Sequence, residues 1–156
     1  MKLTTTILLA AVISICGIFL AIHLNRAPVA HAQSACDAST LTGAYGYTES
    51  GYAYDVQGNI YILASTGRMV ADGNGGLTGT ETSSLDGNIV RRQYTGTYTM
   101  TGDCAGTVTL QFASANATTG GAIHGDIVAV NNARQINFVQ TDANFVFSGV
   151  LTRQNQ

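Results

Sequence analysis

The sequence predicts an all-β domain, an antiparallel and strongly curled barrel of about eight strands, with a β-sandwich as the alternative. Three observations support this prediction. Short runs rich in Thr, Val, Ile, Tyr and Phe alternate with turn residues, glycines recur inside these runs, and after the N-terminal segment no stretch has the apolar period of a helix. The chain has 156 residues, which is enough for one domain of ordinary size.

Turn residues divide the chain into its expected strands. Each connection contains Gly, Asn or Asp, residues that tolerate positive φ or hydrogen-bond their own backbone. We expect strands at residues 42–48, 59–72 (with a break at Gly67 as a variant), 77–85, 89–100, 104–113, 122–130, 135–141 and 145–153.

Glycines inside the strands favour the barrel over the sandwich. Segments such as Tyr94-Thr95-Gly96 and Phe147-Ser148-Gly149 place a glycine two residues after a large apolar residue. A glycine weakens a strand unless the sheet bends there or another backbone comes close. Repeated strand glycines therefore indicate a small, strongly curled sheet.

The first segment has the features of a secretory signal peptide. Lys2 precedes an apolar run at residues 7–22, and Ala30-His31-Ala32 follows as a cleavage motif. We expect a signal peptide at residues 1–32, a barrel domain at 33–156, and a secreted or periplasmic product that does not stay in the membrane. An uncleaved anchor is the alternative, although the run is shorter than the roughly 20 residues that span a bilayer.

Two cysteines follow this leader. Cys36 and Cys104 lie 68 positions apart, and in an exported protein such a pair is expected to form a disulfide. Two free buried thiols are the alternative. His124 is the one histidine after the leader and has no ligand spacing around it. We therefore expect neither a metal site nor a cofactor.

Charge and motifs exclude two functional classes. After the leader the chain has no lysine, and five arginines stand against nine acidic residues, a formal charge of −4. Without a basic patch, nucleic acid is not an expected partner. A G-x-S-x-G nucleophile motif is absent, which argues against a hydrolase of that kind. The sequence does not determine the oligomeric state.

Strand alternation puts an arginine on an apolar face. In residues 89–100, Arg92 alternates onto the same face as Val90, Tyr94 and Tyr98, and this face is expected to point inward. An unpaired guanidinium there would cost several kcal/mol. An acidic partner on a neighbouring strand is therefore expected.

Hairpin geometry predicts which acid that partner is. Asp86-Gly87 is typical of a two-residue type I′ turn, which pairs Leu85 with Asn88 and, further along, Glu81 with Arg92. A slip by one residue would turn every side chain to the other face.

The expected pair has two interpretations. It either fixes the strand register inside a filled core, or forms the polar floor of a ligand cavity with Tyr94 and Tyr98. The predicted ligand-binding residues are thus Glu81, Arg92, Tyr94 and Tyr98, and no catalytic residue is assigned. Glu49 is a weaker candidate near a barrel mouth, and His124 and Asp126 are expected on a polar outer face.

Several motifs resemble an uncharacterised family of small exported bacterial β-barrel proteins. They are Leu41-Thr42-Gly43-Ala44-Tyr45-Gly46-Tyr47, Asp72-Gly73-Asn74-Gly75-Gly76-Leu77-Thr78-Gly79, and Tyr94-Thr95-Gly96-Thr97-Tyr98 followed by Cys104-Ala105-Gly106-Thr107. The strand plan is distantly similar to the calycin-type barrels of allene oxide cyclases and dirigent proteins. That second resemblance implies an apolar substrate in a barrel cavity and cyclisation or coupling without a cofactor; it carries over no catalytic residue.

Three functions remain open from the sequence. The first is an exported barrel that binds a small apolar molecule in its interior. The second is a cofactor-independent, cyclase-like enzyme in which Arg92 stabilises negative charge and Glu81 or a tyrosine moves a proton. The third is an envelope or extracellular interaction module with a filled core, whose working surface would be its Thr-rich outer strand faces.

Overall fold

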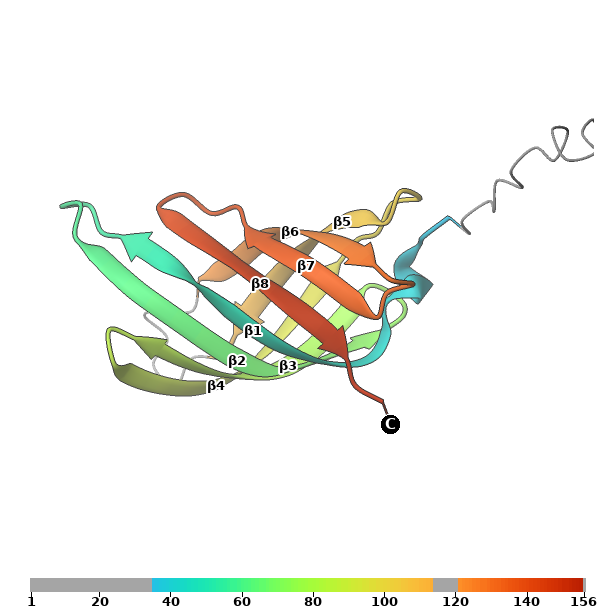
Figure 1. The fold of residues 1–156 in the computed structure, drawn as a ribbon, viewed down its shortest axis with the longest axis horizontal. Coiled ribbons are helices and arrows are strands. Elements are labelled where there is room, and N and C mark those ends of the chain that lie inside the picture. The colour runs from blue at the N-terminus through green and yellow to red at the C-terminus, as the bar shows by residue number, and fades with distance from the viewer. Residues whose placement is uncertain (1–34, 114–120, 156) are drawn as a thin grey trace, which may run out of the picture. The chain divides into compact units, whose positions relative to one another are not determined.

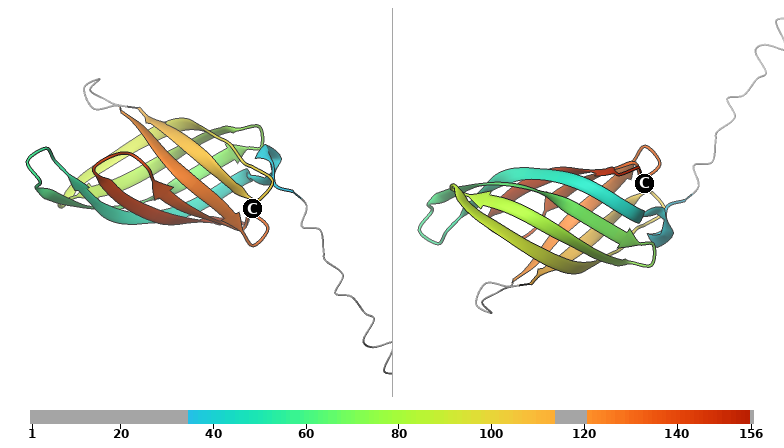
Figure 2. Two further views of the ribbon diagram at one scale, coloured as in Figure 1. Left: turned by 90° about the horizontal axis from the view of Figure 1, so that it is seen from above. Right: turned by 90° about the horizontal axis from the view of Figure 1, so that it is seen from below.

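Eight antiparallel strands form a closed barrel. The structure, a computed structural model, describes residues 35–113 and 121–155, so the expected signal peptide and its cleavage site lie outside the described residues. Each strand pairs with its neighbours in sequence order, and β1 closes the barrel by pairing with β8 (Figures 1 and 2). Closure confirms the predicted barrel and excludes the sandwich.

The strands follow a short 3-10 helix, η1 (Ala38–Thr40). They are β1 (Thr42–Tyr54), β2 (Ile60–Asp72), β3 (Gly76–Leu85), β4 (Asn88–Tyr98), β5 (Ala105–Phe112), β6 (Ala122–Val130), β7 (Gln135–Gln140) and β8 (Phe145–Arg153). Within the described ranges, no helix is long and apolar enough to cross a membrane.

Two differences from the expected strands occur in the N-terminal half. β1 continues beyond the expected end at residue 48, because the segment to Tyr54 pairs with β2 over its whole length and with β8 as far as Ala53. β2 runs unbroken through Gly67, which pairs with Tyr47 on one side and Glu81 on the other. Neighbouring strands on both sides therefore extend β1 and keep β2 continuous.

The β3–β4 hairpin has the predicted geometry. Asp86 and Gly87 have φ values of 47° and 85°, as a type I′ turn requires at both central positions. Leu85 then pairs with Asn88, and Glu81 with Arg92. The predicted register is confirmed.

Inward glycines make room for large side chains in this narrow barrel. A Cβ at Gly149 would overlap the Glu49 side chain on the paired strand, and a Cβ at Gly79 would overlap the Tyr94 ring. The close approach predicted for the strand glycines is therefore present, although here side chains as well as backbone approach them.

Residues 35–41, which precede β1, cover one end of the barrel. Leu41 is almost fully buried, and the Tyr98 hydroxyl lies 2.8 Å from the Ala38 carbonyl oxygen and 2.9 Å from that of Leu41. The predicted disulfide between Cys36 and Cys104 joins this segment to the turn before β5. We call this end, which carries η1, the closed end (Figure 1).

The hydrophobic core is concentrated towards the closed end. It consists of apolar and aromatic side chains from all eight strands and from the segment before β1. They include Leu41, Tyr45, Met69, Leu77, Tyr98, Val108, Ile127, Ile136 and Leu151. The opposite end, which carries the β1–β2, β3–β4 and β7–β8 hairpins, is called the open end (Figure 2).

The disulfide is expected to stabilise the barrel through the closed end. Replacing both cysteines by serine should lower the free energy of unfolding by about 4 kcal/mol, because a long loop is released in the unfolded chain. Urea denaturation of the oxidised protein, the reduced protein and the double variant measures this difference. Equal midpoints for the three samples would contradict it.

Candidate functional site

A cavity of about 690 Å³ occupies the open half of the barrel. Its walls are mainly apolar and come from all eight strands, with residues that include Leu63, Leu85, Val90, Leu110, Phe112, Ile123, Phe138, Phe145 and Phe147. A concave, mostly apolar space of this size with a few polar groups is typical of small-molecule sites. The interior is therefore filled in one half and hollow in the other.

Glu81 and Arg92 lie together in the cavity wall. Nε and Nη2 of Arg92 donate to Oε1 of Glu81 at 3.1 and 2.9 Å. The Glu81 side chain is 5% exposed and that of Arg92 is 29% exposed. The predicted ion pair is thus present on the inner face, with its guanidinium at the border between protein and cavity.

An aromatic ring provides a second partner for the guanidinium. Cζ of Arg92 lies 3.6 Å from the centroid of the Phe112 ring, a cation–π contact. Phe112 packs in turn against Tyr94, with ring centroids 5.3 Å apart. Arg92 is therefore held from two sides.

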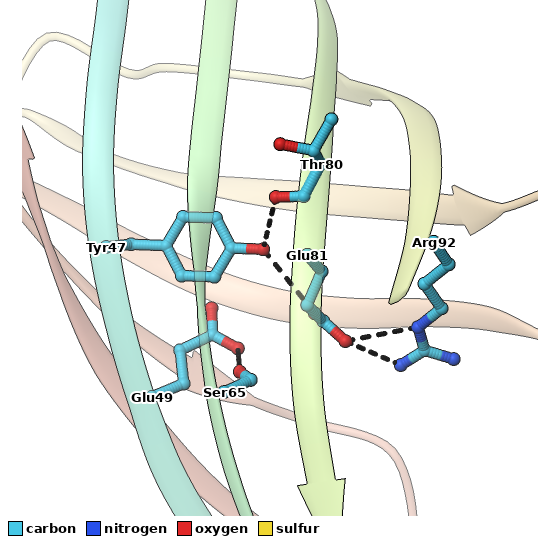
Figure 3. Close-up of polar contacts among 6 residues, drawn as sticks. All are labelled: Tyr47, Glu49, Ser65, Thr80, Glu81 and Arg92. Atoms are coloured by element: carbon cyan, nitrogen blue, oxygen red, sulfur yellow. Dashed lines mark hydrogen bonds and ion pairs between the residues drawn. The ribbon is translucent and has the colours of Figure 1, made fainter. Parts of the chain in front are cut away.

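Tyr47 contacts Glu81 on the side opposite Arg92. Its hydroxyl lies 3.5 Å from Oε2 of Glu81 and 3.4 Å from the Thr80 carbonyl oxygen, and Figure 3 shows Glu81 between Tyr47 and Arg92. Burial raises the pKa of both Tyr47 and Tyr94 well above the ordinary value, and neighbouring charges and hydroxyls add to the effect for Tyr47. Both hydroxyls therefore stay protonated near neutral pH, and that of Tyr47 donates to Glu81 and to the Thr80 carbonyl oxygen.

Glu49 is the second carboxyl in the cavity wall. Its Oε2 accepts a hydrogen bond from the Ser65 hydroxyl at 3.3 Å (Figure 3). The pKa of Glu49 is raised to about 7, first by burial and second by the charge of Glu81, while Ser65 and Arg92 act in the opposite direction. This carboxyl can therefore gain or lose a proton near neutral pH.

The four predicted ligand-binding residues do not all reach the cavity. Glu81 and Arg92 line it. Tyr94 is buried beneath it, and its ring centroid lies 6.5 Å from that of Tyr47. Tyr98 lies at the closed end, where its hydroxyl is engaged by the backbone before β1. The structure thus separates the charged pair from Tyr98, because inward residues of one strand lie at different depths along the barrel.

The cavity wall also carries polar residues outside the predicted four, among them Glu49, which was the weaker candidate, and Ser65 and Gln140, which were not predicted. The alternation of Tyr45, Tyr47 and Glu49 was the available signal for Glu49, which does lie in the open half. Its importance depends on Ser65 on β2 and Gly149 on β8, and those neighbours follow from pairings between distant segments.

The predicted polar outer face is also present. The His124 side chain is 54% exposed, and its Nδ1 lies 2.8 Å from Oδ1 of Asp142. Partial burial raises the pKa of Asp142, but hydrogen bonds from His124 and Gln140 outweigh this and leave it below its ordinary value. Asp126 is exposed on β6. His124 and Asp142 thus form a surface contact at the cavity rim.

The described part of the chain contains no group of three or more His, Cys, Asp or Glu side chains arranged to hold a metal ion. Comparison with protein-family models, with curated proteins and with solved structures found no match for this chain. The site is therefore interpreted from its own geometry.

Removing one member of the ion pair should destabilise the barrel. Arg92→Met leaves the Glu81 carboxylate buried without its cation, and we expect a loss of about 2 kcal/mol, less than for a fully buried pair because Arg92 is partly exposed. Urea denaturation of Arg92→Met, Glu81→Gln and the double variant measures the coupling. Arg91→Met, on the outer face of the same strand, is the control. Additive effects of the two changes would argue against a coupled pair.

Glu49 should make stability depend on pH. Its pKa is raised from 4.5 to about 7, so folding favours the protonated acid. The contribution of Glu49 to the free energy of unfolding is fully present below the pKa that this carboxyl has in the unfolded chain. It is lost as the pH rises through about 7, which lowers the free energy of unfolding by an amount on the order of 2–3 kcal/mol. Glu49→Gln should remove this loss, measured by urea denaturation between about pH 5 and pH 8. Asp126→Asn is the exposed control, and parallel profiles for wild type and Glu49→Gln would contradict the assignment.

Proposed function

We propose that this protein is an exported β-barrel that binds a small, largely apolar molecule in the cavity at its open end. The observation that carries the proposal is the cavity of about 690 Å³ with apolar walls and a few polar groups. A ligand that covers these walls removes apolar surface from water, which contributes about 25 cal/mol per Å². Glu81, Arg92 and Glu49 would orient its polar end.

The division of the interior into two halves favours binding over a filled-core interaction module. Side chains fill the closed half, whereas the open half keeps apolar walls such as Leu110 and Phe147 around a space that the described residues leave empty. A core that served stability alone would gain from larger side chains there, because unfilled space forfeits packing contacts. Export itself is supported by the Cys36–Cys104 disulfide, which suits an oxidising compartment.

The proposal is tested with a neutral environment-sensitive fluorophore, N-phenyl-naphthylamine. We expect saturable binding with a blue-shifted emission, because the dye would enter an apolar space. Ser83→Phe, which places a ring in the cavity, should weaken binding about tenfold or more. Ser83 is buried and lines the cavity.

The matched control for this test is the neighbouring residue. Thr82→Phe adds the same ring on the outer face of β3 and should leave dye affinity unchanged. Absence of saturable dye binding to the folded wild-type protein, or equal effects of the two variants, would overturn the proposal.

A cyclase-like enzyme of the allene oxide cyclase or dirigent type is the second candidate. It is favoured by one observation: an apolar cavity holds both a guanidinium, on Arg92, and a carboxyl whose pKa is about 7, on Glu49. In that case Arg92 would stabilise developing negative charge and Glu49 would move a proton, since Glu81 is engaged by Arg92. The resemblance to those families rests on the closed barrel alone, which does not by itself imply their function.

Mass spectrometry separates the binder from the enzyme. Apolar epoxides that bind, whose cyclisation needs no oxidant, are incubated with wild type and with Glu49→Gln and are then extracted. A binder returns them unchanged, whereas an enzyme converts them and loses this conversion in the folded variant.

A further inference from the structure

Carboxyl groups outnumber cations around the cavity. Among the described residues that line it, Glu49, Glu81 and Asp142 are acidic and Arg92 is the basic one. Asp142 is paired with His124 at the rim. The balance inside the cavity is therefore between two glutamates and one arginine.

The positive charge of Arg92 is already compensated. Both of its bonds to Glu81 end on Oε1, and the Phe112 ring lies against the guanidinium. An anionic ligand would have to compete with Glu81 for this cation while facing the carboxyl of Glu49. A carboxylate or phosphate head is therefore disfavoured.

Glu49 is the carboxyl in the cavity that has no direct cationic partner among the described residues. Its one hydrogen bond comes from the neutral Ser65 hydroxyl, and within residues 35–113 and 121–155 it forms no ion pair. Gly149 leaves space for its side chain to extend along the inner wall. A cationic group that enters the cavity can thus reach a carboxylate that no protein cation occupies.

We propose that the apolar ligand carries one basic amine and that Glu49 binds its ammonium ion. This inference rests on the proposed function and names the class of its ligand. An ammonium–carboxylate hydrogen bond is about twice as strong as a neutral one, and the low-polarity walls strengthen it. The apolar remainder of the ligand would pack against the phenylalanine and leucine side chains.

Proton release accompanies this binding mode. Near neutral pH a protonated Glu49 would lose its proton to solvent as the ammonium ion arrives, so affinity for an amine should rise as pH increases through about 7. The titratable and charged groups facing Glu49 are Tyr47 on its own strand, Glu81 on β3, and Arg92 and Tyr94 on β4. The tyrosines stay protonated in this range because burial raises their pKa, so they do not mimic the effect.

The test compares three probes with the same chain length, n-decylamine, n-decanol and n-decanoate, in displacing N-phenyl-naphthylamine from the wild-type protein. We expect decylamine to bind about tenfold more tightly than decanol at about pH 8, and decanoate to bind most weakly. Lowering the pH to about 5 should remove most of the preference for the amine, because Glu49 becomes protonated.

Glu49→Gln provides the matched variant, since it keeps the shape and removes the charge. It should abolish the preference for decylamine over decanol and the pH dependence of that preference. If decanol or decanoate binds most tightly to wild type, or if the amine preference persists in Glu49→Gln, the inference about the amine is overturned and the apolar site remains. If neither the dye nor any probe binds to the folded protein, the proposed function itself fails.

Discussion

The ion pair between Glu81 and Arg92 lies where the filled half of the barrel meets its hollow half. Either residue alone would destabilise the fold, because burying an unpaired charge in a low-polarity inner wall costs several kcal/mol. Their pairing requires one register between β3 and β4. Since side chains alternate along a strand, that register also decides which residues of both strands line the interior.

The two halves of the barrel have different physical roles. In the closed half, a segment held by the Cys36–Cys104 disulfide, together with Tyr98 and the apolar core, seals one end. In the open half, the hairpins surround a cavity instead of a packed core. The closed half supplies burial that stabilises the fold, and this leaves the open half able to keep space for a ligand.

Polar groups inside the cavity fall into two electrostatic classes. Glu81 and Arg92 compensate one another, and Phe112 and Tyr47 hold them in place. In the part of the chain that the structure describes, Glu49 accepts a hydrogen bond from Ser65 and forms no ion pair, and its pKa is raised to about 7, mainly by burial. The ion pair of Glu81 and Arg92 therefore stabilises the barrel, whereas Glu49 is the group that can respond to a ligand. Because these are different side chains, Glu49 can be substituted without breaking the ion pair.

Local rules were enough to predict much of this architecture from the sequence. Period-two alternation and the Asp86-Gly87 turn determined the inner face of β4 and its pairing with β3, because both signals act over few residues. They could not determine how deep each inward side chain lies, so Tyr98 was grouped with a site that it does not reach. Only tertiary closure of β1 on β2 and β8 brought Glu49 next to Ser65 and Gly149, and only the closed barrel left a cavity at one end. Such contacts join residues that are far apart in the chain, so they cannot be predicted from local propensities or turn motifs.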